Sequence, residues 1–97
     1  MSVRAYYFWS PTCGPCKVVK PNIDELRGVF SSVDFTYINI YEDREGIAEA
    51  FKITVVPTIM VVAFDKDGDV LYRGKHSGTD MLGYYRILRA ANQQLSK

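Results

Sequence analysis

The order of apolar and polar positions predicts four strands along this chain. Val3–Trp9 is a short run of aromatic and aliphatic residues, which is typical of a buried strand. Val33–Ile40 is rich in β-branched and aromatic residues and predicts a second strand. Thr58–Phe64 predicts a third strand, and the turn residues of Asp65–Gly68 predict a hairpin into a fourth, Val70–Arg73.

Three segments between and after these strands are predicted to be helices. The first runs from about Pro15 to Phe30, and Pro21 inside it is expected to kink it. Arg44–Phe51 predicts a short second helix. The third opens near Asp80, a suitable N-cap. Apolar residues at helical spacing in the first helix are Cys16, Val19, Ile23, Leu26 and Phe30, and those expected to be buried by the third are Met81, Tyr85, Leu88 and Leu95.

Length and composition limit the class of protein. Ninety-seven residues predict one domain, 1–97, which buries roughly 65% of the surface of its unfolded chain. Apolar residues make up 47% and charged residues 24%, so disorder is not expected. A net charge of +1 without long runs of one sign gives no support for binding nucleic acid or an anionic membrane.

Targeting features are not evident in the sequence. No apolar run reaches the length of a membrane span, and the N-terminus lacks the pattern of an export signal. We therefore expect a cytoplasmic protein, although an export signal removed by processing would escape this interpretation. In a reducing compartment, a Cys-x-x-Cys pair is more often catalytic or metal-binding than a structural disulfide.

The two cysteines of the chain, Cys13 and Cys16, stand at the predicted start of the first helix. Unpaired N–H groups and the helix dipole stabilise a thiolate there. The apolar stripe of the helix includes Cys16 and leaves out Cys13, so we expect Cys13 at the exposed helix tip and Cys16 facing the core. Cys13 is thus the predicted attacking thiol and Cys16 the resolving one, with Gly14 and Pro15 shaping the turn and leaving the sulfur uncovered.

Metal binding is a weaker interpretation of the same cysteines. Two cysteines and one histidine cannot supply the four ligands of a zinc site within one chain, although a cluster shared by two chains stays open. No metal is predicted. His76 lies in a polar segment and is interpreted as a surface residue, with a catalytic base as the alternative.

One stretch and two later positions resemble a known family. Phe8–Lys17 reads Phe-Trp-Ser-Pro-Thr-Cys-Gly-Pro-Cys-Lys, Pro21 follows inside the helix, and Val56–Thr58 reads Val-Pro-Thr. In this order they resemble the active-site sequence, the helix-kinking proline and the cis-proline loop of the thioredoxin family. The resemblance covers essentially the whole chain. It implies an α/β thioredoxin fold of order β-α-β-α-β-β-α, with a four-stranded mixed sheet and helices on both faces.

The resemblance also implies an activity and its residues. A thioredoxin is a protein disulfide oxidoreductase, here acting through Cys13 and Cys16, whose redox-active disulfide makes a separate cofactor unnecessary. The Val56–Pro57 bond is implied to be cis, so that an extended substrate segment can pair with the backbone of Val56. The implied substrate-binding residues are Val55, Val56 and Pro57. The residues implied to support the active site are Tyr7, Trp9, Gly14, Pro15 and Lys17.

The implied partners follow from the same resemblance. They are disulfide-containing proteins as substrates, and a thioredoxin reductase or glutathione as electron donor. The roles implied are electron transport and cell redox homeostasis. We expect a monomer that binds neither nucleic acid nor membranes.

Three departures from the family pattern are visible. The chain begins at the position of the family's second strand, so we expect a small thioredoxin without the leading strand and helix. Thr12 stands where a tryptophan usually precedes the first cysteine, which removes an apolar rim. Tyr7 and Tyr37 replace a buried aspartate and its lysine partner. Since a tyrosine is no base at neutral pH, a group other than the family's carboxylate must deprotonate Cys16.

Two alternatives stay open. A glutaredoxin-like, glutathione-dependent oxidoreductase is suggested by the missing leading elements and by Ser77–Asp80, which resembles that family's glutathione-carboxylate loop. Gly14 and Pro15 between the cysteines speak against it. A redox-independent binding module could dock partners through Val55–Pro57 and the rim at Trp9, but such a scaffold has no need of two thiols.

Overall fold

One four-stranded sheet forms the centre of the molecule. The computed structural model describes residues 1–96, and the strands are β1 (Ser2–Trp9), β2 (Asp34–Asn39), β3 (Thr58–Phe64) and β4 (Val70–Ser77). Their order across the sheet is β2-β1-β3-β4. β1 pairs in parallel with β2 and antiparallel with β3, and β3 pairs antiparallel with β4. The mixed sheet implied by the sequence is therefore confirmed.

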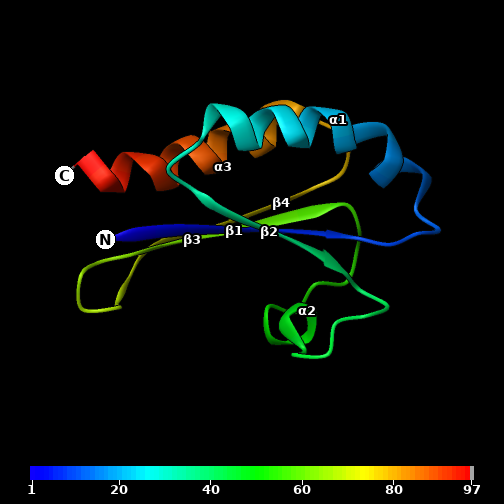
Figure 1. The fold of residues 1–97 in the computed structure, drawn as a ribbon, viewed down its shortest axis with the longest axis horizontal. Helices are drawn as coiled ribbons and strands as arrows, with labels where there is room; N and C mark the ends of the chain where they lie inside the picture. The colour runs from blue at the N-terminus through cyan, green and yellow to red at the C-terminus, as the bar shows by residue number, and fades with distance from the viewer. Residues whose placement is uncertain (97) are drawn as a thin grey trace.

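Helices cover both faces of this sheet (Figure 1). α1 (Gly14–Val29) and α3 (Met81–Gln93) lie side by side on one face, and the 3₁₀ turn η1 (Gln94–Ser96) continues α3. The single turn α2 (Ile47–Ala50) lies on the opposite face. Within residues 1–96, no helix combines the length and the apolar character that crossing a membrane requires.

The bounds of three elements show where local pattern and tertiary pairing differ. β3 has the predicted bounds, whereas β4 continues past Arg73 to Ser77, because its polar half still pairs with β3 as far as Thr58. The short second helix shrinks to one turn, which the Asp43 carboxylate caps by accepting the N–H groups of its first two residues. α1 continues through Pro21.

The main core lies between the sheet and the α1–α3 pair. The predicted stripe of α1 is buried as expected: Cys16, Val19, Ile23 and Leu26, followed by Phe30. In α3 the prediction was wrong for Tyr85, which is 39% exposed and packs on the edge of Phe30. Tyr84 is buried in its place, together with Leu88 and Ala91, while Met81 and Leu95 are partly buried. A buried stripe through Tyr84 and one through Tyr85 both have helical spacing. Tyr84 is the buried residue because its hydroxyl donates to the carbonyls of Pro57 and Gly78.

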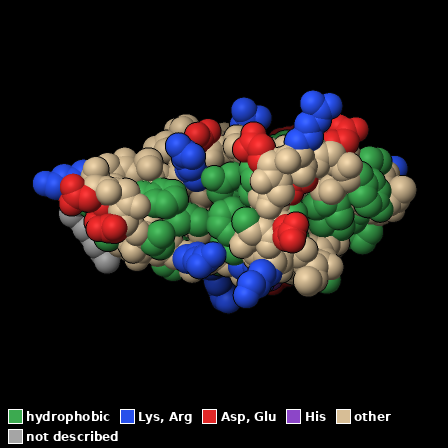
Figure 2. Space-filling view, turned by 90° about the horizontal axis from the view of Figure 1, so that it is seen from below, with side chains coloured by type: hydrophobic (Ala, Val, Ile, Leu, Met, Phe, Trp, Pro, Cys, Tyr) green, Lys and Arg blue, Asp and Glu red, His purple; other side chains and the backbone are tan. Residues whose placement is uncertain are grey.

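A smaller core lies under α2. Phe8, Met60 and Val62 are buried there, and Phe51 packs its ring against Tyr6 at 5.3 Å between centroids. Seen from this side, hydrophobic side chains stay visible between charged ones (Figure 2). Part of the apolar surface on this face is therefore exposed.

Candidate active site

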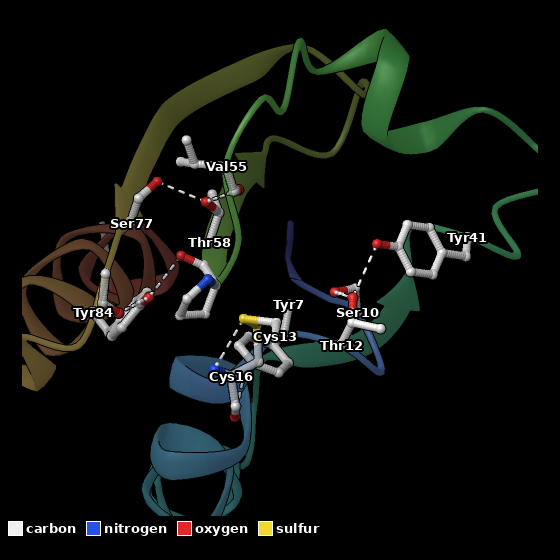
Figure 3. Close-up of a disulfide and its surroundings, with 12 residues drawn as sticks. Tyr7, Ser10, Thr12, Cys13, Cys16, Tyr41, Val55, Thr58, Ser77 and Tyr84 are labelled. Carbon is white, nitrogen blue, oxygen red and sulfur yellow. Dashed lines mark hydrogen bonds between the residues drawn. A yellow bond between two sulfur atoms is a disulfide. The ribbon is translucent and has the colours of Figure 1, made fainter.

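The two cysteines lie at the start of α1 and are joined by a disulfide (Figure 3). Cys13 is the N-cap of the helix, and its Sγ accepts the backbone N–H of Cys16 at 3.1 Å. Their Cα atoms are 5.2 Å apart. A sulfur that caps a helix faces unpaired N–H groups and the positive end of the dipole, which lowers the free energy of a thiolate. The predicted position of Cys13 at the helix start is confirmed.

The cysteines differ in exposure, but less than expected. Cys16 is 3% exposed and faces the core, as predicted. Cys13 is 9% exposed, so it is the more accessible sulfur without standing free at the helix tip. The reason is the turn that precedes it, which folds back and donates the N–H of Cys13 to the carbonyl of Ser10 at 3.2 Å. A molecule that reacts with the Cys13 sulfur must therefore approach it closely.

The residues between the cysteines leave that side open. Gly14 and Pro15 are exposed, and a Cβ placed on Gly14 would meet no atom within 4 Å. Pro15 lies in the first turn of α1, where its missing N–H removes no helical hydrogen bond. Lys17 is exposed one residue beyond Cys16.

The segment Val55–Thr58 faces the same end of the sheet. Thr58 pairs with Phe8, so the Val56–Pro57 bond, which is cis, lies level with the turn that follows β1. Pro57 is buried, and its carbonyl accepts the N–H of Gly78 at 3.0 Å and the hydroxyl of Tyr84 at 3.2 Å. The segment is thus held from β4 and α3.

Two features of this segment remain available to another molecule. Val55 is 55% exposed, although Thr58 donates its hydroxyl to the Val55 carbonyl at 2.7 Å. Within the part of the chain that the structure describes, no hydrogen bond uses the backbone N–H or C=O of Val56. An extended peptide laid beside Val56 could satisfy both groups.

Tyr7 lies beneath the active-site helix. Its side chain is 1% exposed, and its hydroxyl donates to the carbonyl of Cys16 at 3.1 Å. Burial, and to a lesser degree the charge of Asp24, raises the pKa of Tyr7 to about 12. Tyr7 therefore keeps its proton at neutral pH and holds the backbone of Cys16 rather than acting as a base.

Tyr37 and Asp24 complete a polar group beside Tyr7. Tyr7 and Tyr37 are paired across β1 and β2, with ring centroids 5.5 Å apart. The Tyr37 hydroxyl donates to Asp24 at 2.5 Å, and Lys20 forms an ion pair with the same carboxylate at 2.9 Å. The Tyr37 hydrogen bond, followed by Lys20, lowers the pKa of Asp24. Sequence reasoning missed Asp24, and the Lys20–Asp24 spacing of four residues was its visible signal.

Trp9 lines a cavity beside Cys16. The cavity holds about 510 Å³. Trp9 is half-buried and packs against the main core. Its lining includes Tyr7, Trp9, Cys16, Lys17, Lys20 and Tyr37, together with the carboxylates of Glu42, Asp43 and Glu45. Cys16 thus lies at the wall of a cavity that also contains acidic side chains.

Comparison with known proteins settles the family of this chain. A family model described as Thioredoxin matches residues 5–84. The chain belongs to the thioredoxin family. It is 34% identical over 86 residues to a thioredoxin of Mycoplasma pneumoniae, an alignment that covers 89% of this chain and 76% of that protein.

Other thioredoxins match over shorter stretches. A thioredoxin of Mycoplasma genitalium is 41% identical over 54 residues, which is 56% of this chain and 52% of that protein. For spinach chloroplast thioredoxin M-type the identity is 39% over 62 residues, 64% of this chain and 33% of that protein. The chain thus spans about half or less of the length of these two curated relatives.

Solved thioredoxin structures share the fold. Oxidised mitochondrial thioredoxin 3 of Saccharomyces cerevisiae superposes with a TM-score of 0.75 at 25% identity, covering 92% of this chain and 78% of that one. Fasciola hepatica thioredoxin gives 0.74 at 22% identity, covering 93% and 81%, which supports the fold alone.

In this member of the thioredoxin family, Thr12 takes part in a contact that the sequence did not reveal. Its hydroxyl lies 3.0 Å from the hydroxyl of Tyr41, which follows β2. Ser10, which is buried, lies 3.5 Å from Thr12 through its own hydroxyl. The residue that precedes the first cysteine is therefore joined to an aromatic residue from the segment that follows β2.

The segment proposed to resemble a glutathione loop is occupied by internal contacts. Ser77 lies 2.6 Å from Thr58 through the two hydroxyls. Gly78 donates its N–H to Pro57, and the Asp80 carboxylate accepts the N–H of Leu82 as the cap of α3. These contacts leave few groups of Ser77–Asp80 for a ligand.

His76 is not simply a surface residue, which corrects the sequence interpretation. Its ring is half-buried and lies edge-on to Tyr84, with centroids 4.7 Å apart. Its Nε2 is 3.0 Å from the carbonyl of Asp80. The residue thus joins β4 to α3. Among residues 1–96, no group of three or more metal-binding side chains is found.

Proposed function

We propose that this thioredoxin-family chain is a protein disulfide oxidoreductase that reduces target disulfides through Cys13 and Cys16. The observation that carries the proposal is the Cys13–Cys16 disulfide at the N-terminus of α1, with Cys13 as the helix cap. This position lowers the free energy of the attacking thiolate, and the partner sulfur is already within bonding distance. Both catalytic roles rest on this arrangement.

The reaction proceeds in two exchanges. In the reduced protein, the Cys13 thiolate attacks one sulfur of the target, the target S–S bond breaks, and the second target sulfur leaves as a thiolate. Cys16 then loses its proton and attacks Cys13 Sγ, which breaks the mixed disulfide and releases the first target sulfur. The target gains two electrons and two protons, and the Cys13–Cys16 disulfide forms. A reductase or glutathione reverses this change.

The target is held by the segment Val55–Pro57 in this proposal. An extended strand of the target pairs with the free N–H and C=O of Val56, while Val55 offers an exposed apolar side chain. Pro57 fixes the segment because its carbonyl is bonded from β4 and α3.

The supporting residues act on the cysteines. Gly14 and Pro15 leave the approach to Cys13 open, and Tyr7 holds the Cys16 carbonyl. Trp9 and Lys17 line the cavity through which water reaches Cys16 and accepts its proton. With Tyr7 neutral, water takes the role that a buried carboxylate would otherwise have.

The cellular setting is proposed from family membership and composition. The substrates are disulfide-containing proteins, the electron donor is a thioredoxin reductase or glutathione, and the redox-active disulfide is the redox group. We place the protein in the cytoplasm, as a single-domain monomer that serves electron transport and redox homeostasis. The balanced net charge of +1 supports neither nucleic acid nor membranes as partners.

The roles of the cysteines can be tested by trapping. Cys16→Ser should accumulate mixed disulfides with a target such as insulin, since no thiol remains to resolve them. Cys13→Ser should trap none, because Cys16 is 3% exposed. Non-reducing gels and mass spectrometry identify the adducts, and the wild-type protein with dithiothreitol as electron source is the control. The opposite trapping pattern would refute the assignment.

A redox titration against glutathione separates the reducing role from an oxidising one. For comparison, the reduction potential is about −270 mV for thioredoxin and about −180 mV for protein disulfide isomerase. A potential near the first supports a reductant. A potential near the second would contradict the proposed direction of electron flow.

A further inference from the structure

Tyr41 is an exposed aromatic residue whose hydroxyl contacts Thr12, the residue that precedes Cys13. Its side chain is 65% exposed, whereas Tyr7, Phe8 and Tyr84 are buried. The backbone N–H of Tyr41 donates to the Asn39 side chain at 3.0 Å. The Tyr41 hydroxyl lies 3.0 Å from that of Thr12. One hydrogen bond at the backbone and one at the hydroxyl of Tyr41 therefore hold its aromatic ring in an exposed position.

The position of Tyr41 follows from the pairing of β1 and β2. The N–H of Ile40 donates to the carbonyl of Trp9 at 3.0 Å, so the two strands end at the same level. Tyr41 then leaves the sheet where the turn to Cys13 begins. In Figure 3, Thr12 lies between Cys13 and Tyr41, and Val55 lies on the opposite side of Cys13.

A shallow hollow continues this surface toward the substrate segment. It holds about 610 Å³, and its apolar lining includes Ile40, Ile53, Val55 and Val56. Ile40 adjoins Tyr41 in sequence, and Val56 carries the free backbone groups described above. The hollow thus extends from the strand end that carries Tyr41 to the segment that pairs with a target.

We propose that Tyr41 is a specificity-determining residue that binds a large apolar side chain next to the reactive cysteine of a protein target. The inference rests on the proposed reductase function. Cys13 is 9% exposed, so the target backbone must lie close to the turn. A segment paired with Val56 then crosses the hollow and brings its flanking residues onto the Tyr41 ring. A small polar disulfide has no such side chain and gains nothing from Tyr41.

The Thr12 hydroxyl is a positioning group in this proposal. It holds the Tyr41 ring in one orientation, which lowers the entropy lost when the target binds. Tyr41→Phe keeps the ring and removes this hydrogen bond, as does Thr12→Val. The two variants should therefore have similar, partial effects, and the double variant should show no further loss.

The test uses two disulfide peptides that differ at one residue beside the cysteine, leucine in one and serine in the other. For the wild type we expect a higher kcat/KM with the leucine peptide. Tyr41→Ala should reduce this preference by about 4-fold or more, the equivalent of at least one buried methylene group of the leucine side chain. The preference of Tyr41→Phe for the leucine peptide should lie between those of the wild type and Tyr41→Ala. Val29→Ala, which removes a side chain that is 67% exposed at the far end of α1, is the matched control.

Reduction of hydroxyethyl disulfide, a small polar disulfide, separates the role of Tyr41 from the proposed reductase function. Val29→Ala should reduce this disulfide at the wild-type rate, Tyr41→Ala should lose less rate on it than on the leucine peptide, and the rate at which Cys13 is alkylated should be the same in both variants. An equal loss on both peptides, or an unchanged preference in Tyr41→Ala, would overturn the role of Tyr41. A wild-type protein that reduces none of the three compounds would contradict the reductase function instead.

Discussion

At the scale of single residues, Tyr7 differs most from what its position in the family leads one to expect. The phenol is buried, neutral and bonded to the Cys16 carbonyl, where the family places a carboxylate. The carboxylate nearest to this site is instead that of Asp24 on α1. Asp24 is partly exposed, forms an ion pair with Lys20 and accepts a hydrogen bond from Tyr37. A buried charge without a partner is strongly destabilising, so exchanging both family charges together avoids that cost.

The first prediction concerns resolution by Cys16. Tyr7→Asp should speed resolution near neutral pH, because it places a base below the Cys16 thiol. It should also lower the free energy of unfolding by about 3–5 kcal/mol, since a buried aromatic side chain is lost and a carboxylate is left among apolar atoms. Stopped-flow decay of a preformed mixed disulfide measures the first effect, and urea unfolding the second.

Tyr7→Phe is the matched control for this change. It removes the hydrogen bond to Cys16 and should cost about 1 kcal/mol, with resolution at the wild-type rate. If folded Tyr7→Asp also resolves at the wild-type rate, this position does not govern proton transfer.

At the scale of elements, the contact of β4 with α3 fixes the segment Val55–Pro57. His76 fills the space below Gly83, where a Cβ would overlap the imidazole. The same imidazole lies against Tyr84, whose hydroxyl bonds to the carbonyls of Pro57 and Gly78. The close approach of strand and helix therefore depends on a glycine in the first turn of α3, where a residue with a side chain would favour the helix more.

The second prediction tests this packing. Gly83→Ala should lower the free energy of unfolding by about 1–3 kcal/mol, because the His76 ring must leave both Tyr84 and the Asp80 carbonyl. In a His76→Ala background the same change should instead stabilise by up to about 1 kcal/mol, the ordinary gain of alanine over glycine. Urea unfolding of the wild type, the two single variants and the double variant completes the double-mutant cycle. Additive effects would show that the two residues do not compete for this space.

At the scale of the whole molecule, three tyrosine hydroxyls link the elements around the main core. Tyr7 lies on β1, Tyr37 on β2 and Tyr84 on α3. Burial raises the pKa of Tyr7 to about 12, and burial followed by the Asp24 hydrogen bond does the same for Tyr37. Burial also raises the pKa of Tyr84. Each phenol is thus stabilised in its neutral form by the fold.

The third prediction is a loss of stability in alkali. Because the folded pKa values of these phenols lie above the ordinary value of 10.0, their contribution is complete below pH 10. It should be lost as the pH rises from 10 through about 12, since the unfolded chain releases these protons first. Urea unfolding at several pH values, followed alongside tyrosinate absorbance, measures both events. Tyr37→Phe should make the free energy of unfolding less dependent on pH in this range. An unchanged dependence would show that Tyr37 does not contribute to the loss of stability.

The sequence by itself determined the parts that local chemistry controls. The helix stripe from Cys16 to Phe30 follows from hydrophobic periodicity, and the bounds of β3 follow from a nearly continuous apolar run that ends at a turn signal. The position of the cysteines at a helix start follows from Pro15 and the break before it. The motif order that points to the thioredoxin family is likewise written in the chain.

Only the tertiary structure decided the contacts between distant segments. The choice of Tyr84 over Tyr85, the placement of Asp24 by Tyr37, and the contact of Thr12 with Tyr41 each join residues from different elements. Periodicity gives the face of an element, with two registers sometimes equally good, but not the partner that a side chain meets there. That partner is set by strand pairing and helix packing, through which the same residues gain buried hydrogen bonds that no local pattern encodes.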